Sequence, residues 1–309
     1  MRMLVVGAGA TGGYFGGRLV QAGRDVTFLV RPGRASELRS NGLQIVSPRG
    51  NVTLQPRLVS ANAVERTYDV VLLTVKGFAL EAALDDIAPA IGPKTMILPV
   101  LNGMRHVDLL EARFGKRHVI GGVCKVATTL DDRGRIIQLA GFQELAYGEM
   151  DGTASARVIA LDAFMQGAGF DVRLSPAIAR EMWEKWILLA TMSGITCLMR
   201  GTIGEIEAVH GGVAFVHRLL DEVSGIATQV GEKPDETFLA QARQILTAKG
   251  SPQTSSMYRD LQNGRRLELD QIIGDLVARA HAAAIVSQLL ETVMAHLSVY
   301  EDRRNAVSN

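Results

Sequence analysis

The sequence has little of what disulfide-rich proteins and metalloproteins need. Its 309 residues include two cysteines, Cys124 and Cys197, which are too few and too far apart for a disulfide framework or a zinc site. The six histidines show no H-E-x-x-H or similar ligand spacing. We therefore expect no metal, and we expect both cysteines to be small core residues.

Neither sign of charge dominates, and no long apolar run occurs. The 33 basic and 32 acidic residues give a net charge of +1, which provides no field to attract nucleic acid or an anionic membrane. No stretch reaches the length of about 18 apolar residues that a membrane span needs, and no charged-then-apolar signal precedes the first expected strand. We expect a soluble, cytoplasmic protein with a small-molecule partner.

The first 31 residues contain a strand, a glycine turn, a helix and a second strand. Residues 3–6 predict a buried parallel strand, and Gly7, Gly9 and Gly12 follow with the G-x-G-x-x-G spacing of a dinucleotide-binding turn. The first glycine permits the tight turn, the second lets the backbone approach a pyrophosphate, and the third lets the helix pack closely. We expect the helix to stop at Ala22-Gly23 and the second strand to span residues 26–30.

The residue at the end of that second strand indicates which dinucleotide binds. An acidic residue there would bind the ribose hydroxyls of NAD, whereas an arginine accommodates a 2′-phosphate. The residue is Arg31, and no acidic residue occurs between Asp25 and Glu37. We therefore predict NADP(H) as cofactor, with Arg34 as a second candidate contact.

The next 140 or so residues continue an α/β pattern. Residues 68–75 and 95–100 predict central parallel strands, which place Lys76 and Asn102 at the carboxyl edge, where open sheets bind ligands. A hairpin is expected from residues 43–47 and 52–58 around the turn at 48–51. A strand at 118–130 and segments 135–139 and 145–148 suggest further hairpins, so the sheet becomes mixed. The remaining expected elements are helices at 32–40, 78–87, 107–114 and 154–167 and a last strand at 169–173.

Beyond residue 175 the periodicity is helical. We predict an NADP-binding, Rossmann-type parallel sheet with a mixed extension in residues 1–175, and an all-α substrate domain in residues 176–309. The amphipathic face of the last helix is typical of core packing or of a homodimer contact, and the pattern does not separate the two. The expected helices are 178–200, 212–230, 235–249, 256–284 and 286–304.

The most informative stretch of the second domain surrounds Lys185, which lies between Trp183 and Trp186 in a run that becomes almost wholly apolar. A lysine there needs a partner, water or a function, although a stem that merely covers the tryptophan rings is an equal alternative. Farther on, residues 254–257 open a helix with a hydroxyl at the cap position, and Glu268 is expected in its later turns.

In combination, these stretches resemble the ketopantoate reductase (2-dehydropantoate 2-reductase) family over essentially the whole chain. The resemblance rests on five motifs in the family's order: Gly7-Ala8-Gly9-Ala10-Thr11-Gly12 with Arg31, Thr74-Val75-Lys76, Leu101-Asn102-Gly103, Trp183-Glu184-Lys185-Trp186, and Ser255-Ser256-Met257-Tyr258-Arg259-Asp260 with Glu268-Leu269-Asp270.

The resemblance implies reduction of a 2-keto acid by NADPH, as in pantothenate biosynthesis, in a cleft between a Rossmann domain and a helical domain. It implies that Lys185 is the catalytic lysine and that Glu268 fixes this lysine or the substrate. Ser256 matches a substrate contact, while Asn102 and Lys76 match groups beside the nicotinamide. The chemistry agrees, because a hydride that reaches a keto carbon builds negative charge on its oxygen, which a lysine can stabilise and protonate.

Departures from the family concern the substrate. The family's asparagines one and two turns after the lysine are Leu189 and Ser193 here, and the asparagine before Gly274 is Ile273. A further family asparagine falls at or next to Ile203. Removing hydrogen-bonding groups relaxes discrimination for substrate hydroxyls. We therefore expect a paralogue that reduces a different, more apolar 2-keto acid or ketone, with Ser193 as a remaining polar contact, and ketopantoate itself stays open as the substrate.

Two other function classes stay open. One is another NADP-dependent hydroxy- or imino-acid dehydrogenase with the same two-domain plan, and the other is a non-catalytic NADP-binding sensor. Lys185 separates them, because an enzyme loses turnover when this lysine is removed and a sensor does not. Lys125 is a weaker candidate for charge in the substrate site, and His106 is interpreted as a helix-start residue.

Overall fold

The computed structural model describes residues 1–308, with side chains described through residue 306. Residue contacts divide the chain into two compact units. Unit 1 holds residues 1–101 and 106–179, and unit 2 holds residues 102–105 and the chain from Arg180 onward. The short segment 102–105 follows a strand of unit 1 but belongs by its contacts to unit 2.

Unit 1 contains the predicted parallel sheet. Its five strands all pair in parallel in the order β5-β2-β1-β6-β7, which confirms the Rossmann-type fold class. The order reverses between β1 and β6, so ligands are expected beyond the carboxyl ends of these two strands. The strands are β1 (Arg2–Val6), β2 (Asp25–Leu29), β5 (Arg57–Val59), β6 (Tyr68–Leu73) and β7 (Ile91–Pro99).

The expected helices of this unit are present, with short 3₁₀ turns beside them. The first helix begins directly after the second glycine of the turn and ends before Gly23, whose φ of +73° marks the left-handed residue expected there. The helices are α1 (Ala10–Gln21), α2 (Pro32–Asn41), α3 (Leu80–Ile87), α4 (Arg105–Phe114) and α5 (Ala156–Met165), and the 3₁₀ turns are η1 (Ala61–Ala63), η2 (Gly77–Ala79), η3 (Ala88–Ala90) and η4 (Lys116–His118).

The mixed part is a second sheet and not a continuation of the first. Its strands are ordered β10-β9-β3-β4, and β8 pairs with β9 in an antiparallel hairpin. The hairpin expected from residues 43–58 was partly wrong, because its second arm divides and residues 57–59 pair with β2 of the parallel sheet. The strands are β3 (Leu43–Val46), β4 (Val52–Leu54), β8 (Gly121–Leu130), β9 (Ile136–Gly148) and β10 (Asp171–Leu174).

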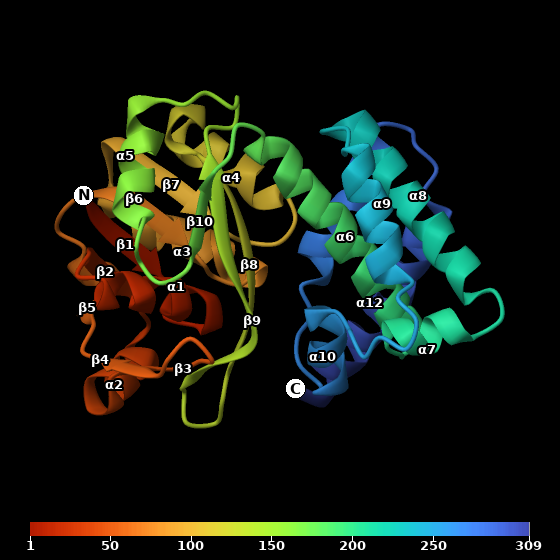
Figure 1. Ribbon diagram of the computed structural model, residues 1–309, viewed down its shortest axis with the longest axis horizontal. Helices are drawn as coiled ribbons and strands as arrows, with labels where there is room; N and C mark the ends of the chain where they lie inside the picture. The colour runs from red at the N-terminus through yellow and green to blue at the C-terminus, as the bar shows by residue number, and fades with distance from the viewer. Residues whose placement is uncertain (309) are drawn as a thin grey trace. The chain divides into compact units, whose positions relative to one another are not determined.

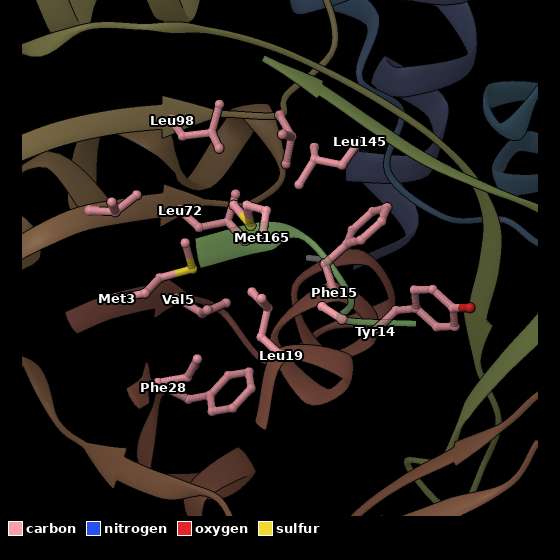
Figure 2. Close-up of a cluster of buried hydrophobic side chains, with 14 of the residues drawn as sticks. Met3, Val5, Tyr14, Phe15, Leu19, Phe28, Leu72, Leu98, Leu145 and Met165 are labelled. Carbon is pink, nitrogen blue, oxygen red and sulfur yellow. The ribbon is translucent and has the colours of Figure 1, made fainter. Parts of the chain in front are cut away.

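The core of unit 1 lies around α1, which packs against both sheets. A Cβ on Gly16 would lie 2.7 Å from the ring of Phe28 in the parallel sheet, and one on Gly17 would lie 2.8 Å from side chains of β3 in the second sheet. Glycines on the helix therefore let both sheets approach its axis. Figure 2 shows Tyr14, Phe15 and Leu19 of this helix among buried side chains of the strands and of α5.

The described residues of unit 2 form helices joined by loops and contain no strand, as predicted (Figure 1, green to blue). The helix expected at 256–284 was wrong as a single element. It stops at Asn263-Gly264, where Gly264 has φ +65°, and resumes only after residue 268 with a π-turn. The helices are α6 (Ile178–Met199), α7 (Ile203–Ala208), α8 (Gly212–Val230), α9 (Glu236–Leu246), α10 (Ser256–Gln262), the π-turn η5 (Asp270–Gly274), α11 (Asp275–Ala282) and α12 (Gln288–Ser308).

Within residues 1–308, no helix combines the length and the hydropathy that a membrane crossing requires. The same residues contain no group of three or more His, Cys, Asp or Glu side chains placed to hold a metal ion.

Candidate functional site

The glycine turn joins β1 to α1 at the point where the strand order reverses. Gly7 has φ +95°, a conformation that favours glycine, and its N–H donates to the Leu29 carbonyl at 3.0 Å. Gly9 is the N-cap of α1, and a Cβ built on it would meet no atom within 4 Å. The space above Gly9 is thus open, and the free N–H groups of the first helical turn lie beside it.

Gly12 is enclosed where Gly9 is open. A Cβ on Gly12 would lie 2.1 Å from Thr74 Oγ1 and 2.2 Å from the Gly7 carbonyl oxygen. The Thr74 hydroxyl lies 2.8 Å from the Val6 oxygen and 3.1 Å from the Gly7 oxygen, to which it can donate. Thr74, directly after β6, therefore links the end of β6 to the glycine turn through these hydrogen bonds. The predicted close packing at Gly12 is observed.

Two arginines follow the second strand in different environments. Arg31 is the N-cap residue of α2 and is exposed, and within residues 1–308 its side chain makes no hydrogen bond or ion pair. Arg34 is engaged by the protein itself, because its Nε donates to the Ala8 carbonyl at 3.0 Å and its Nη1 contacts Glu37 at 2.8 Å. Arg31 is thus available to a ligand, whereas Arg34 holds the glycine turn.

Two lysines were candidates for additional charge in this unit. Lys76 is exposed at the start of η2, two residues after Thr74. The Lys125 Nζ lies 3.3 Å from Glu144 Oε1 on the second sheet, and its side chain is 59% exposed. Arg173 contacts the same carboxylate at 3.3 Å, so Lys125 belongs to a surface ion-pair group.

In unit 2, Lys185 lies on α6 between the two tryptophans, as the sequence requires. It is partly exposed, whereas Trp183 and Trp186 are 5% and 1% exposed. The two indole rings are 5.0 Å apart, and the Arg279 guanidinium lies 5.8 Å from each ring centroid. The turn of α6 that carries Lys185 thus also carries a buried tryptophan pair, which the Arg279 guanidinium contacts by cation–π interactions.

Asn102 and Glu268 meet in unit 2. The Asn102 Nδ2 donates to Glu268 Oε2 at 3.3 Å, and the Glu268 side chain is buried. The next residue, Gly103, has φ +77°, and a Cβ on it would lie 2.1 Å from the Gln271 carbonyl oxygen of the π-turn. The Asn102-Gly103 turn thus packs directly against the backbone that follows Glu268. The two predicted residues are brought together across 166 positions of sequence.

Ser256 occupies the first turn of α10 and is exposed. Its neighbour Ser255 is the actual cap, since its Oγ accepts from the Tyr258 N–H at 3.0 Å and lies 2.9 Å from Thr196 Oγ1 of α6. Ser255 therefore caps α10 and contacts α6, whereas Ser256 is exposed to solvent.

The positions that depart from the family pattern lie in different environments. Leu189, one turn after Lys185, is partly exposed, whereas Ser193 is 1% exposed in the interior of the helix packing. Ile273 is 0% exposed within the π-turn. Of the three, Leu189 is the side chain that presents an apolar surface outward on the face of α6 that carries Lys185.

Sequence reasoning did not find the roles of Thr74, Arg34 and Trp186. The Trp186 Nε1 donates to the Ile272 carbonyl at 2.8 Å, a bond between residues 86 apart in the chain. Thr74 was part of a recognised motif, which is the one signal that could have indicated its role. Arg34 and Trp186 donate to main-chain carbonyls, of Ala8 and Ile272. Every residue has a carbonyl, so the sequence does not indicate which one a side chain will bind.

Both cysteines are in packed positions, as expected. Cys197 is buried on α6, and burial raises the pKa of its thiol to about 12. Cys124 is partly buried on β8, with its Sγ 3.7 Å from the Val100 carbonyl oxygen. Cys197 is thus unsuited to nucleophilic chemistry near neutral pH, because the thiolate is the reactive form.

The chain is similar to known proteins over nearly its whole length. The family model for ketopantoate reductase PanE/ApbA matches residues 3–152, and the model for its C-terminal part matches residues 177–301. The chain is 36% identical over 301 residues to the "Uncharacterized oxidoreductase YkpB" of Bacillus subtilis, covering 97% of this chain and 99% of that protein. It is 28% identical over 297 residues to the 2-dehydropantoate 2-reductase of Mesorhizobium japonicum, covering 88% and 89%.

A solved structure shows the same fold. The crystal structure of 2-dehydropantoate 2-reductase from Geobacter metallireducens superposes with a TM-score of 0.85 at 28% identity, over 96% of this chain and 99% of that one. The family matches, the relatives and the structural likeness extend over nearly the whole chain, and they lead to one conclusion: the chain belongs to the ketopantoate reductase family and is an oxidoreductase of that family.

Proposed function

We propose that this oxidoreductase reduces a 2-keto acid to the corresponding 2-hydroxy acid with NADPH, and that Lys185 is the general acid. The observation that carries the proposal is the hydrogen bond from Asn102 to Glu268, which joins two of the predicted residues in the unit that also bears Lys185. A glutamate is rarely buried unless it is paired, and the Glu268 side chain is buried with the Asn102 amide as its partner.

The residues of unit 1 fit a dinucleotide. The open space above Gly9 is one that a Cβ would fill, and the donors of the first turn of α1 are suited to a pyrophosphate. Arg31 is the unengaged guanidinium at the end of β2, which supports NADPH over NADH. When bound, the reduced nicotinamide supplies a hydride to the keto carbon.

The residues of unit 2 supply the rest of the chemistry in the proposal. As electrons move from the carbonyl bond to its oxygen, the Lys185 ammonium stabilises that oxygen and donates the proton that completes the hydroxyl. Asn102 and Ser256 donate hydrogen bonds that orient the substrate carboxylate and carbonyl. Glu268, held by Asn102, orients Lys185 or the substrate.

The substrate proposed is a 2-keto acid with an apolar side chain. Leu189 presents an apolar, partly exposed side chain one turn after Lys185, where the family pattern has an asparagine. Ser193 and Ile273 are almost fully buried and so offer little polar surface to a substrate hydroxyl. A pocket without hydrogen-bond partners for hydroxyls favours substrates that lack them.

The test is a panel of 2-keto acids assayed with NADPH. Ketopantoate and apolar 2-keto acids of similar size are compared by kcat/KM. We expect the apolar acids to be reduced more efficiently, and full efficiency on ketopantoate alone would contradict the substrate assignment. Absence of turnover with every acid, together with NADPH binding, would favour the sensor alternative.

Lys185→Ala tests the catalytic role. Loss of a general acid is expected to lower kcat by about 10²- to 10⁴-fold, while the affinity for NADPH stays unchanged. Lys116→Ala is the matched control, because that side chain is 87% exposed and, among the residues that the structure describes, its ion pair is the one with Glu111 at 3.9 Å. Wild-type turnover in Lys185→Ala would refute the assignment.

Arg31→Ala tests the cofactor. Removing a phosphate-binding guanidinium is expected to weaken NADPH much more than NADH. Arg39→Ala on the same helix, also exposed, is the control for a general loss of positive charge. Equal losses for the two cofactors in Arg31→Ala would contradict the proposed NADPH preference.

A further inference from the structure

Glu268 is followed by a rare element. The five residues Asp270–Gly274 form a π-turn, in which one extra residue widens the helix, and such turns occur frequently at functional sites. The residue before Glu268 is also held, because the Leu267 N–H donates to Glu301 Oε1 of α12 at 2.8 Å. The backbone on both sides of the carboxylate therefore has defined partners.

The π-turn is held by the indole of Trp186. The Trp186 Nε1 donates to the Ile272 carbonyl at 2.8 Å in a buried environment, where an unmade hydrogen bond is costly. The ring cannot readily reorient, since it is 1% exposed, the Trp183 ring lies beside it at a 40° tilt, and the Arg279 guanidinium lies 5.8 Å from its centroid. Arg279 is itself held by Asp275 at 3.1 Å.

The same turn receives the loop that carries Asn102. The position of a Cβ on Gly103 is 2.1 Å from the Gln271 oxygen and 3.8 Å from Trp186 Nε1. The indole N–H, the π-turn carbonyls and the Asn102-Gly103 turn therefore meet at one point. A change in the Trp186 bond would move the π-turn and with it the two groups that form the Asn102–Glu268 hydrogen bond.

We infer that Trp186 is a positioning residue: its indole N–H, bound to the Ile272 carbonyl, holds the π-turn so that Glu268 and Asn102 keep their geometry relative to Lys185 on the same helix. The inference rests on the proposed function, because it assumes that Glu268 acts in turnover. It adds a side chain that touches neither cofactor nor substrate.

Trp183 provides a matched control. It has the same ring, lies on the same helix, contacts the same Arg279 at the same 5.8 Å, and makes no hydrogen bond to the π-turn in the described structure. Trp186→Phe and Trp183→Phe remove the same atoms from neighbouring buried positions. We expect kcat to fall about 10- to 100-fold in Trp186→Phe, as for a misplacement of about 1 Å, and to change by less than about threefold in Trp183→Phe. NADPH affinity is expected to stay at the wild-type value in both.

A double-mutant cycle with Glu268→Gln shows whether Trp186 acts through the carboxylate. If it does, Trp186→Phe lowers kcat in the wild-type background and has little further effect in Glu268→Gln. Equal losses in both backgrounds, or equal losses in the two tryptophan variants, would overturn the inference and leave the proposed function intact. Full turnover in Glu268→Gln would overturn the inference and the orienting role proposed for Glu268, while the proposed reduction itself would stand.

A second variant covers the case in which Trp186→Phe does not fold. Replacing Trp186 by 3-benzothienylalanine keeps the size of the bicyclic ring and removes only the N–H donor. The same fall in kcat is expected with an unchanged melting temperature. Wild-type kcat in this variant would refute the positioning role.

Discussion

Gly9 and Gly12 belong to one motif, yet replacement by alanine should leave stability almost unchanged at Gly9 and lower it strongly at Gly12. In Gly9→Ala the new methyl group enters open space, with no atom within 4 Å, and the residue's φ of −81° is normal for alanine. In Gly12→Ala the methyl carbon lies 2.1 Å from Thr74 Oγ1 and 2.2 Å from a main-chain oxygen. The first change leaves the fold intact, and the second forces the turn to open.

The expected magnitudes follow from these contacts. In Gly9→Ala, the lower entropy of the unfolded chain should stabilise the folded protein by about 0.4–1 kcal/mol. Alanine is a poorer N-cap residue than glycine, which should destabilise the protein by a similar amount. The free energy of unfolding should therefore change by less than about 1 kcal/mol. At Gly12, overpacking against a backbone atom that must move by roughly 1 Å should cost about 3 kcal/mol or more.

Nucleotide binding should fall in both variants. In Gly9→Ala the methyl group occupies the space proposed for the pyrophosphate, and we expect at least about a tenfold rise in Kd, or about 1.4 kcal/mol. At an NADPH concentration of about 100 times the wild-type Kd, the ligand stabilises the wild-type protein by about 2.7 kcal/mol and a tenfold weaker variant by about 1.4 kcal/mol.

Thermal unfolding with and without NADPH, together with a direct binding titration, measures both effects. Gly225→Ala on α8 is the control, because it also adds a methyl group to a site with no atom within 4 Å but lies outside the motif. If Gly9→Ala bound NADPH as tightly as the wild type, the proposed use of the open space would be refuted. A Gly12→Ala protein of wild-type stability would refute the packing argument.

Three further outcomes are expected. Glu222 on α8 accepts from the N–H groups of Leu289 and Leu290 at 3.1 and 2.8 Å, so Glu222→Ala should lower the unfolding free energy by about 1–2 kcal/mol in denaturant titrations, and no loss would contradict this capping role. Arg157 holds the pKa of the Glu149 carboxyl below its usual value in the folded protein. The extra stability of the wild type over Glu149→Gln should therefore be complete above the pKa of Glu149 in the unfolded chain, and it should disappear as pH falls through the lower pKa of the folded state. A stability difference that does not change with pH would show that the charge of Glu149 contributes nothing. Because burial raises the pKa of Cys197, a thiol reagent at neutral pH should leave it unmodified in the folded protein, and mass spectrometry that finds it labelled would contradict its burial.

Local patterns predicted most of unit 1. The glycine spacing, the apolar strands and the arginine after the second strand are properties of short segments, and the structure places each of them in the expected element. The hairpin around residues 48–51 was only half right, because residues 57–59 found a better partner in β2 than in β3. Which strand a segment pairs with depends on which sheet edge is available in the folded chain, and the apolar periodicity of the segment does not predict its partner.

The helix expected at residues 256–284 shows the same limit in unit 2. Residues 263–268 begin with Asn263-Gly264 and contain a single apolar residue, Leu267. The chain leaves the helix there, and Leu267 and Glu268 are held instead by Glu301 and Asn102. Tertiary partners for a single N–H and a single carboxylate outweigh the weak helical preference of a few residues. Glu268 therefore lies outside the helix in which it was expected.

From the amino-acid order alone came the nucleotide turn, the candidate cofactor, the α/β and all-α halves and the residues of the candidate site, since each depends on neighbours a few positions apart. The pairing of Asn102 with Glu268, the Trp186 bond to Ile272 and the contact of Arg34 with Ala8 became visible only in the folded chain. These contacts join residues 26 to 166 positions apart, and their geometry is set by packing.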